Sequence, residues 1–476
     1  MRNGCGAITM PSIQLPIVRG DKTTAQTDYG DRLPKNMIAV SKEIRGAAGY
    51  LISADGLKSF GAGLGLDRGG YYSDRQAKHC RVSGGRFITV GTDGAVTNVG
   101  AISGAGQASF AQSFNSLCVV TDGKAWRYVG GSLVQITDPD LKAPIDVCWI
   151  DGYFFFTDGQ YIYHTQPNNE ALIDPLDYAT AEFMPDKSLG VMQTQDNFVL
   201  VFGRYSMEYF VNQANVDFAF SRIAQKSIQA GIVGTHCKCM LSGMVFILGG
   251  RKDETASFHV VQAGGIENLS TQTVDEIFSS YTEAELSTAV LESRTDERDQ
   301  LVIVRLLRHT LMYNHKAAMT IGKQNAWSVL SYGVSNDVWL GANGVFDPRI
   351  AKWVYGSVYD AGIYTLDKTS AALNNTAVEC EFSTPLVPAK NVRVGDIELN
   401  TIAGYNKSDV VLFMSVSFEG AFVSSEMMQV YSGSLQYGKP LIIRRAVGYV
   451  SHEFSLQFRC VSKDKINVSN LVVNYG

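Results

Sequence analysis

Short runs of β-branched and aromatic residues recur in pairs around tight turns along most of the chain, whereas helical periodicity is nearly absent. A chain patterned in this way buries its apolar side chains in sheets, so the sequence predicts an all-β protein. We expect hairpins at Arg86–Val90 with Ala95–Val99, Leu117–Thr121 with Ala125–Val129, Tyr153–Thr157 with Tyr161–His164, Phe198–Phe202 with Met207–Val211, Met244–Leu248 with Ser257–Val261, Leu301–Val304 with Thr310–Tyr313, and Trp353–Val358 with Gly362–Leu366.

The first three hairpins share the turn sequence Thr-Asp-Gly, which ends at Gly94, Gly123 and Gly159. Asp-Gly is a strong hairpin signal because a tight primed turn needs positive φ, which glycine adopts without steric cost. We therefore expect the same turn geometry at all three positions.

The hairpins begin at intervals of 31 to 57 residues. Irregular repeats of this size, each built around a hairpin, are typical of propeller blades. One blade cannot bury both of its faces alone, so several must close around an axis. We predict a β-propeller of about six or seven blades, the count being left open by the polar hairpin around Gly94. Stacked β-sandwiches are the alternative.

With 476 residues the chain is long enough for about three domains. We predict an extended N-terminal arm over residues 1–50, the propeller over residues 51–373, and a C-terminal β-sandwich, or jelly-roll-like, domain over residues 374–476. Asn374-Asn375-Thr376 marks the second boundary, because alternating strands at sandwich spacing follow it. The arm either crosses to a neighbouring subunit or supplies a strand that completes the propeller.

One segment breaks the β-pattern. Helix-forming residues occupy Thr273–Glu292, with a capping box at Thr282 and Glu285 and apolar positions at Leu286 and Val290. This predicts an amphipathic helix inserted in the propeller, which packs on its rim or on another subunit.

Charge and hydropathy exclude several classes of protein. The net charge of −5 argues against a basic surface that holds nucleic acid by neutralising phosphates. No apolar stretch approaches the length of a transmembrane helix, so we expect no membrane-spanning segment. The first residues lack the apolar region of a secretory signal, which predicts synthesis in a cytoplasm, with Met10 as an alternative start to Met1.

Motifs of common enzyme classes are missing from the sequence. Gly61-Ala-Gly63-Leu-Gly65-Leu66 has leucine where the dinucleotide fingerprint needs its last glycine, and nucleophile-elbow and zincin motifs do not occur. His236-Cys237-Lys238-Cys239 has metal-ligand residue types but lacks a second pair at zinc-finger spacing. We therefore predict no catalytic, cofactor-binding or metal-binding residues and no cofactor, and interpret the cysteines and histidines as structural.

A glycan-cleaving propeller is the enzymatic alternative, because paired carboxylates on blade loops act as acid and base in glycoside hydrolysis. Asp122, Asp151 and Asp158 are the candidate acids. Turn geometry alone explains an Asp-Gly at a hairpin tip, so we interpret these aspartates as turn residues.

Basic residues occur in two small clusters, Arg305-Leu-Leu-Arg-His309 and Arg444-Arg445. We interpret them as solvated strand faces. If they lined a channel, so few cations would guide a polyanion without trapping it.

Several segments in register resemble the tail hub, or nozzle, proteins of short-tailed bacteriophages, also called packaged-DNA stabilisation proteins. The order and spacing agree over most of residues 10–373, whereas the C-terminal domain resembles the family in strand layout more than in motif. The matching segments are Asp31–Met37, Met207–Phe210, Ile228–Lys238, Ser280–Glu292 and Arg305–Tyr313.

This resemblance implies a structural, non-enzymatic protein of the virion tail, made in the host cytoplasm. Proteins of that family form a homohexameric ring below the portal and its adaptor ring, extend the DNA channel, hold the tail needle or plug, and support the tailspikes. The resemblance thus implies these partners and the transient passage of double-stranded DNA. A peripheral propeller that binds or cleaves receptor glycans is the alternative function.

Overall fold

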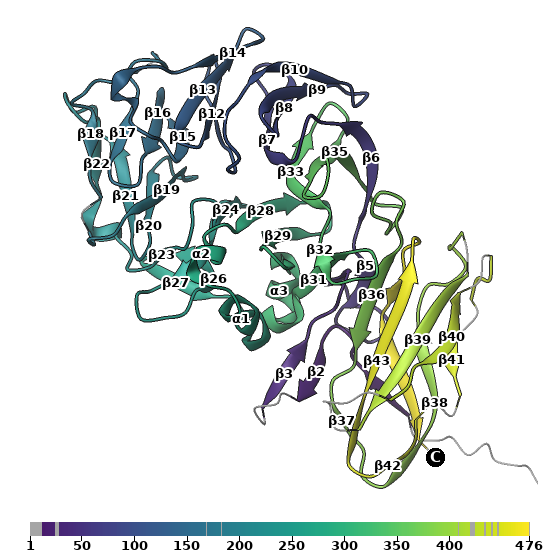
Figure 1. Cartoon of the computed structure of the whole chain (residues 1–476). Coiled ribbons are helices and arrows are strands. Elements are labelled where there is room, and N and C mark those ends of the chain that lie inside the picture. Colours follow the sequence, from purple (N-terminus) through teal and green to yellow (C-terminus); the bar gives the residue numbers. More distant parts are fainter. Residues whose placement is uncertain are drawn as a thin grey trace, which may run out of the picture.

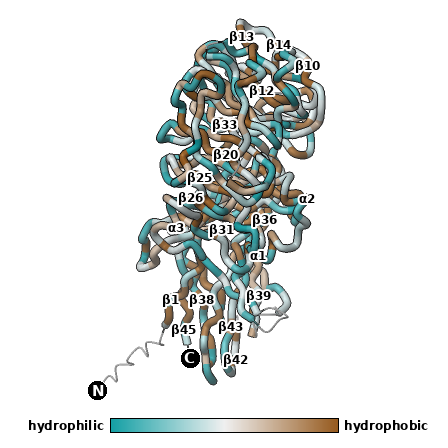
Figure 2. Tube along the Cα trace, turned by 90° about the vertical axis from the view of Figure 1, so that its left-hand side faces the viewer, coloured by the Kyte–Doolittle hydropathy of each residue, from teal (hydrophilic) through white to brown (hydrophobic). Residues whose placement is uncertain are grey.

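The structure is a computed structural model that describes residues 12–23, 28–167, 169–181, 183–407, 409–418, 424–432, 435–438, 441–444 and 447–475. The chain forms a β-propeller and a β-sandwich that lie at opposite ends of an elongated molecule (Figures 1 and 2). The all-β prediction and the two-domain fold class are confirmed. None of the helices in the described residues is long and apolar enough to span a membrane.

The described residues form seven blades, each an antiparallel sheet of four or five strands. Blade 1 contains β7 (Asp67–Ser73), β8 (Lys78–Ser83), β9 (Arg86–Val90) and β10 (Val96–Ala101). Blade 2 contains β11 (Ser109–Gln112), β12 (Leu117–Thr121), β13 (Lys124–Val129) and β14 (Ser132–Gln135). Blade 3 contains β15 (Asp146–Ile150), β16 (Tyr153–Thr157), β17 (Ile162–His164) and β18 (Tyr178–Ala179), and the 3-10 helix η1 (Pro139–Leu141) precedes it.

The other four blades follow in chain order. Blade 4 contains β19 (Ser188–Gln193), β20 (Val199–Gly203), β21 (Met207–Asn212) and β22 (Phe220–Arg222), and η2 (Ala224–Lys226) follows it. Blade 5 contains β23 (Gly231–Ile232), β24 (Lys238–Leu241), β25 (Met244–Gly250), β26 (Ser257–Gln262) and β27 (Gly265–Asn268). Blade 6 contains β28 (Val290–Thr295), β29 (Gln300–Arg305), β30 (Thr310–Asn314), β31 (Trp327–Tyr332) and β32 (Asp337–Val338). Blade 7 contains β33 (Gly341–Asp347), β34 (Lys352–Ser357), β35 (Gly362–Asp367) and β6 (Gly56–Ala62).

Strand β6 closes the ring, because it precedes blade 1 in sequence but pairs with β35 in blade 7. Gly94, in the β9–β10 turn, lies against this closure. A Cβ at Gly94 would lie 1.9 Å from the carbonyl oxygen of Phe60, and the φ of Gly94 is 86°. Only glycine can adopt this φ and also leave room for the Phe60 carbonyl. The β9–β10 turn, whose polar residues left the blade count open, is therefore where blades 1 and 7 meet.

All seven predicted hairpins are present. Six are the second and third strands of their blades, but Arg86–Val90 is the third strand of blade 1. The second strand there, β8, was not predicted. Counted from Lys78, the interval to the next blade is 39 residues instead of 31, which removes the shortest interval of the series.

The expectation of one shared Asp-Gly turn is wrong. Asp122 and Gly123 have φ of 49° and 73° and form the two-residue connection between β12 and β13, as a primed turn requires. At Gly94 and Gly159 the connections are longer, and only the glycine has positive φ. The turn between β15 and β16 is instead a second two-residue Asp-Gly connection.

The helix predicted over Thr273–Glu292 is two short helices followed by a strand. They are α1 (Gln272–Ser279) and α2 (Glu283–Leu286), and Val290 already belongs to β28. The capping box of Thr282 and Glu285 is present, but Thr282 is extended (φ −72°, ψ 159°), so it starts a new helix and ends the previous one. A third helix, α3 (His315–Ile321), and η3 (Lys323–Asn325) lie between β30 and β31.

The sandwich has two layers. In one layer, β36 (Val378–Ser383), β43 (Glu453–Ser462), β39 (Val410–Ser417) and β40 (Met427–Ser432) lie side by side, and β37 (Val387–Pro388) pairs with β43. In the other, β1 (Ser12–Leu15), β45 (Asn470–Tyr475), β38 (Val392–Asn400) and β41 (Leu441–Ile443) lie side by side, and β42 (Gly448–Val450) pairs with β38.

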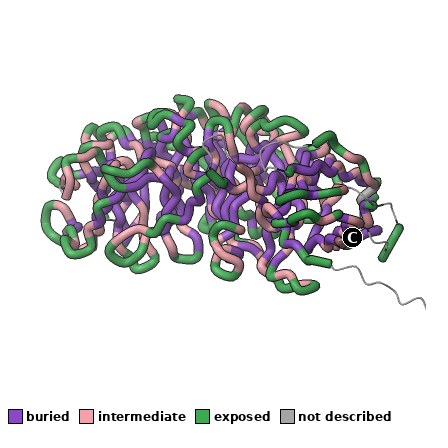
Figure 3. The backbone as a smooth tube through the Cα atoms, turned by 90° about the horizontal axis from the view of Figure 1, so that it is seen from below, coloured by how far each residue is buried: buried purple, intermediate pink, exposed green. Residues whose placement is uncertain are grey.

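The described part of the expected arm pairs within its own chain. Strand β1 completes a sandwich layer, β2 (Gly20–Thr23) pairs with β3 (Tyr29–Arg32), and β4 (Met37–Val40) with β5 (Tyr50–Ser53) and β44 (Asn467–Val468) forms a small sheet between the domains. One apolar core therefore runs from the sandwich through Met37 and Leu51 to Leu301 of blade 6. Figure 3 shows this buried interior continuing from the propeller into the sandwich.

Candidate functional site

A cavity of about 470 Å³ lies on the propeller axis. In the described residues its lining comes from the innermost strands of all seven blades or from the residues beside them: β7, β11, β15, β19, β24, β28 and β33. A cavity of this size matches a small molecule rather than a DNA duplex.

The charges of the cavity wall are paired across blades. Asp146 of blade 3 lies 2.7 Å from Lys238 Nζ of blade 5 and accepts a hydrogen bond of 2.8 Å from the backbone N–H of Val191 in blade 4. Both charged side chains are almost fully buried. Removing either would leave an uncompensated buried charge, so the pair joins three blades.

A second group joins blades 6 and 7. The two carboxylate oxygens of Glu292 each accept a backbone hydrogen bond of 2.8 Å, from Asn343 and from Gly344. Arg305 Nε lies 3.4 Å from Glu292, and Arg305 Nη2 donates to the side chain of Asn343 at 3.0 Å. The sequence placed Arg305 on a solvated strand face, but it is half-buried in this group.

His236 also lines the cavity. Burial, together with the nearby Lys238 ammonium, lowers the pKa of its imidazole to about 4. The imidazole is therefore neutral near pH 7. A neutral histidine beside charges that already have partners favours a structural wall over an acid–base centre.

Of the remaining residues of the cysteine–histidine segment and the two basic clusters, Cys239 also lines the cavity. Cys237 and Arg308 have partners elsewhere. The Cys237 thiol donates to the carbonyl oxygens of Leu286 and Ala289 at 3.5 and 3.4 Å, away from the cavity group, and the described residues contain no cluster of three or more metal-ligand side chains. Arg308 pairs with Glu285 at 2.6 Å, which fixes α2. Arg444 is exposed, and Arg445 lies outside the described residues.

The candidate acids of the glycan-cleaving alternative lie apart. Asp151 precedes β16 and Asp158 follows it, so they lie at opposite ends of a five-residue strand, about 17 Å long. Glycosidase carboxyl pairs are about 5–10 Å apart. Asp158 accepts hydrogen bonds from two backbone N–H groups of its own turn, and Asp151 accepts from the amides of Asn197 and Asn212.

Asp122 connects blades 1 and 2. Its carboxylate accepts a hydrogen bond of 2.7 Å from Arg68 Nη2, another from Thr121 at 2.8 Å, and one of 3.0 Å from the backbone N–H of Gly106. These contacts give the Asp122 carboxylate a structural role between the two blades.

We expect Asp122→Ala to lower the free energy of unfolding by about 1–2 kcal/mol, because it leaves the buried Arg68 guanidinium without its carboxylate. Asp158→Ala, at a half-buried turn where the carboxylate accepts only from its own turn, is the control and should cost less than about 1 kcal/mol. Urea unfolding of both variants measures the difference. An equal loss in the two variants would contradict the role given to Asp122.

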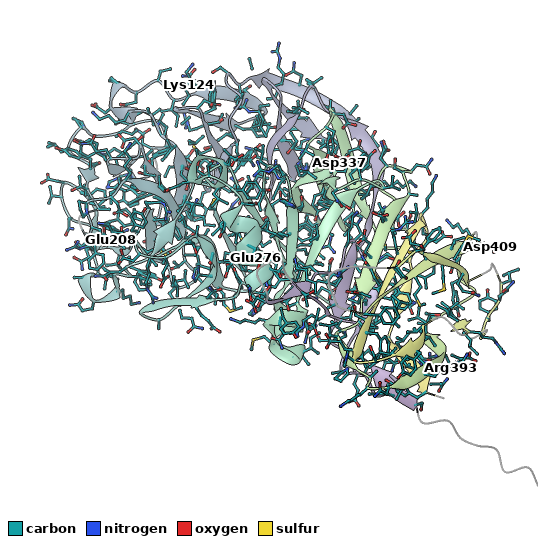
Figure 4. The ribbon with its side chains drawn as sticks, turned by 60° about the horizontal axis from the view of Figure 1, so that its bottom comes forward. Lys124, Glu208, Glu276, Asp337, Arg393 and Asp409 are labelled. Carbon is teal, nitrogen blue, oxygen red and sulfur yellow. The ribbon has the colours of Figure 1, made fainter. Side chains whose placement is uncertain are left out.

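Other charged side chains are spread over the surface instead of gathering around the cavity. Figure 4 labels Lys124 and Asp337 on the propeller and Arg393 and Asp409 at separate places on the sandwich. The described residues therefore do not support a function that depends on a single catalytic cleft.

Two buried ion-pair clusters do stand out, and neither was predicted. At the ring closure, Arg81 is fully buried, pairs with both carboxylate oxygens of Asp67 at 2.7 and 2.9 Å, and donates to the Asn343 carbonyl of blade 7 at 3.0 Å. Between the domains, Asp55 pairs with Arg294 of blade 6 at 2.8 Å and with Lys465 of the sandwich.

Asn36 makes a second polar connection between the domains. Its side chain exchanges hydrogen bonds of 2.9 and 2.8 Å with Ser331 of blade 6 and donates to the Glu379 carbonyl of the sandwich at 2.7 Å. The neighbouring Lys35 lies 2.6 Å from the Glu379 carboxylate. These buried polar contacts therefore lie between blades and between the two domains.

The chain matches models of a known protein family. A family model described as bacteriophage P22 Gp10, beta-propeller, matches residues 13–371, and one described as bacteriophage P22 Gp10, beta-sandwich, matches residues 379–476. The chain belongs to the P22 Gp10 family. With the tail hub relative described next, this membership supports a structural role in a bacteriophage tail.

A P22 Gp10 relative matches along the whole chain. The tail hub protein gp10 of Salmonella phage P22 is 27% identical over 478 residues, which cover 97% of this chain and 98% of the relative.

Solved structures resemble the propeller more distantly. Virginiamycin B lyase from Staphylococcus aureus is 11% identical with a TM-score of 0.44 and covers 64% of this chain and 97% of its own. The Pan2 WD40 domain from Neurospora crassa is 7% identical with a TM-score of 0.44, over 65% and 94% of the two chains.

Proposed function

We propose that this protein is the tail hub of a short-tailed phage: a non-enzymatic ring of six copies below the portal and adaptor. In this role it extends the DNA channel, retains the packaged genome, and supports the needle or plug and the tailspikes. The observation that carries the proposal is the match of both domains, in order and over nearly the full chain, to one tail hub family.

The polar contacts support a wall rather than a catalyst. The axial cavity of a single propeller is small, and its charges are paired across blades. Double-stranded DNA would therefore pass between copies of the chain, along the ring axis. The net charge of −5 suits such a conduit, because dense cation contacts to phosphate would hold the DNA and oppose its sliding.

A density map of the intact tail tests the placement. We expect six copies around the tail axis, between the portal-adaptor assembly and the distal needle or plug. Copies found only at the periphery of the particle would contradict the hub and favour a receptor-binding propeller.

A glycan assay tests the enzymatic alternative. Purified protein incubated with host surface polysaccharide should release no more reducing sugar than a blank. Sugar release that is lost in Asp122→Asn or Asp158→Asn would overturn the non-enzymatic proposal.

A further inference from the structure

Two cysteines face each other in the sandwich. Cys380 of β36 and Cys460 of β43 are directly opposite in an antiparallel register, and their side chains are 1% and 0% exposed. The next pair along the same face, Phe382 and Phe458, stacks with ring centroids 4.9 Å apart. Both cysteines therefore point into the same apolar core.

The register places the two cysteines directly opposite each other, and the Cys380 thiol donates to the Asn36 carbonyl at 3.6 Å. Directly opposite residues in an antiparallel pair have Cα atoms about 4.5–5.5 Å apart. Disulfides are found at Cα separations of about 4.4–6.8 Å, so the bond can form with little movement of the backbone.

The position of this pair in the fold gives a crosslink a consequence. Strand β36 is the first strand after the propeller, and its backbone bonds with Lys35 and Gly333 hold it against the arm and blade 6. Strand β43 is the centre of its layer, between β36 and β39. A bond between Cys380 and Cys460 would tie the domain junction to the middle of the sandwich.

We infer that Cys380 and Cys460 are a modification site: a hydroperoxide converts them into a disulfide in the folded protein, which locks β36 to β43. The proposal is independent of the hub function. Its setting is a chain that folds with free thiols and afterwards meets an oxidant.

The reaction balances with hydrogen peroxide as the oxidant. One thiolate attacks the peroxide, an S–O bond forms as the O–O bond breaks, and the departing hydroxide takes up a proton to give water. The Cys460 thiol then attacks the sulfenic sulfur as it gives up its proton. The S–S bond forms as the S–O bond breaks, and the departing hydroxide takes up that proton and leaves as a second water. The hydrogen bond from Cys460 lowers the pKa of the Cys380 thiol, which suits Cys380 to the first attack.

The test treats the full-length protein with hydrogen peroxide under native conditions and reads intact mass and peptide maps without reduction. We expect the loss of two hydrogen atoms and a crosslinked peptide pair that contains Cys380 and Cys460. The oxidised protein should also unfold on the order of tenfold more slowly in guanidinium, because the crosslink closes a loop of about 80 residues, and dithiothreitol should reverse the effect.

The matched variants are Cys380→Ala and Cys460→Ala, with Cys148→Ala of blade 3 as the control that keeps the pair. The control should gain the crosslink and the slower unfolding, and the two sandwich variants should gain neither. Sulfinic or sulfonic acids at these positions without a crosslink, a crosslink to another cysteine, or thiols that stay reduced until the protein unfolds would each overturn the inference.

Discussion

Asp55→Ala is expected to lower the free energy of unfolding by about 3–5 kcal/mol, the cost of breaking a buried ion pair from one side. Asp55 is 6% exposed and is the shared partner of Arg294 in blade 6 and Lys465 in the sandwich. Its removal takes the carboxylate from Lys465 and leaves Arg294 with Asp296 as its remaining partner. Guanidinium unfolding measures the loss, and Glu297→Ala, at an exposed acidic residue in the same region, should stay near wild type.

The same variant has a predicted pH dependence. Burial raises the pKa of Asp55, but the pairs with Arg294 and Lys465 outweigh burial and hold the pKa below its ordinary value. A carboxyl group with a lowered folded-state pKa stabilises the protein above its unfolded pKa, about 3.9 for aspartate, and loses that contribution as the pH falls through the folded value. The gap between wild type and Asp55→Ala should therefore be full at pH 7 and shrink below about pH 4. A gap that is constant with pH would contradict the ion-pair account.

Arg81→Leu is the second large effect, and we expect a loss of about 3–5 kcal/mol. The variant leaves Asp67 buried without its bidentate partner, and it removes the donor to the backbone of blade 7 at the point where the ring closes. The same unfolding experiment applies. Arg86→Leu, at an exposed residue one strand away, is the control.

Arg81→Lys separates charge from geometry at this site. Lysine keeps the positive charge but cannot present two parallel donors to Asp67, so we expect it to recover part of the lost stability and not all of it. A wild-type value for Arg81→Leu would show that the cluster does not hold the closure.

The repeated hairpins could be predicted because a hairpin is local. Its strands are close in sequence, and alternation plus a turn residue marks them. The predictions are wrong where a residue outside the hairpin determines the local conformation. Gly94 looked like a weak tip because its partner is the Phe60 carbonyl of the closing strand. The Thr282 capping box was recognised, but its extended backbone divides the predicted helix.

Long-range partners explain what the sequence could not show. Asp55 is 239 residues from Arg294 and 410 from Lys465, and β1 pairs with β45 at the other end of the chain. No spacing rule links such residues. The segments that resemble the tail hub family contain residues that connect parts of the fold. Lys35 and Asn36 connect the two domains, and Arg305 and Lys238 connect blades. The resemblance therefore includes these residues, and their contacts in the structure explain what they do.

Genome retention in virions that lack this protein tests the central claim most directly. We predict that particles assembled without it package DNA and then lose it, and that they do not infect. Supplying the protein in trans should restore both stable DNA-filled heads and infectivity. Stable, infectious DNA-filled particles in its absence would contradict the assignment of this chain as the tail hub.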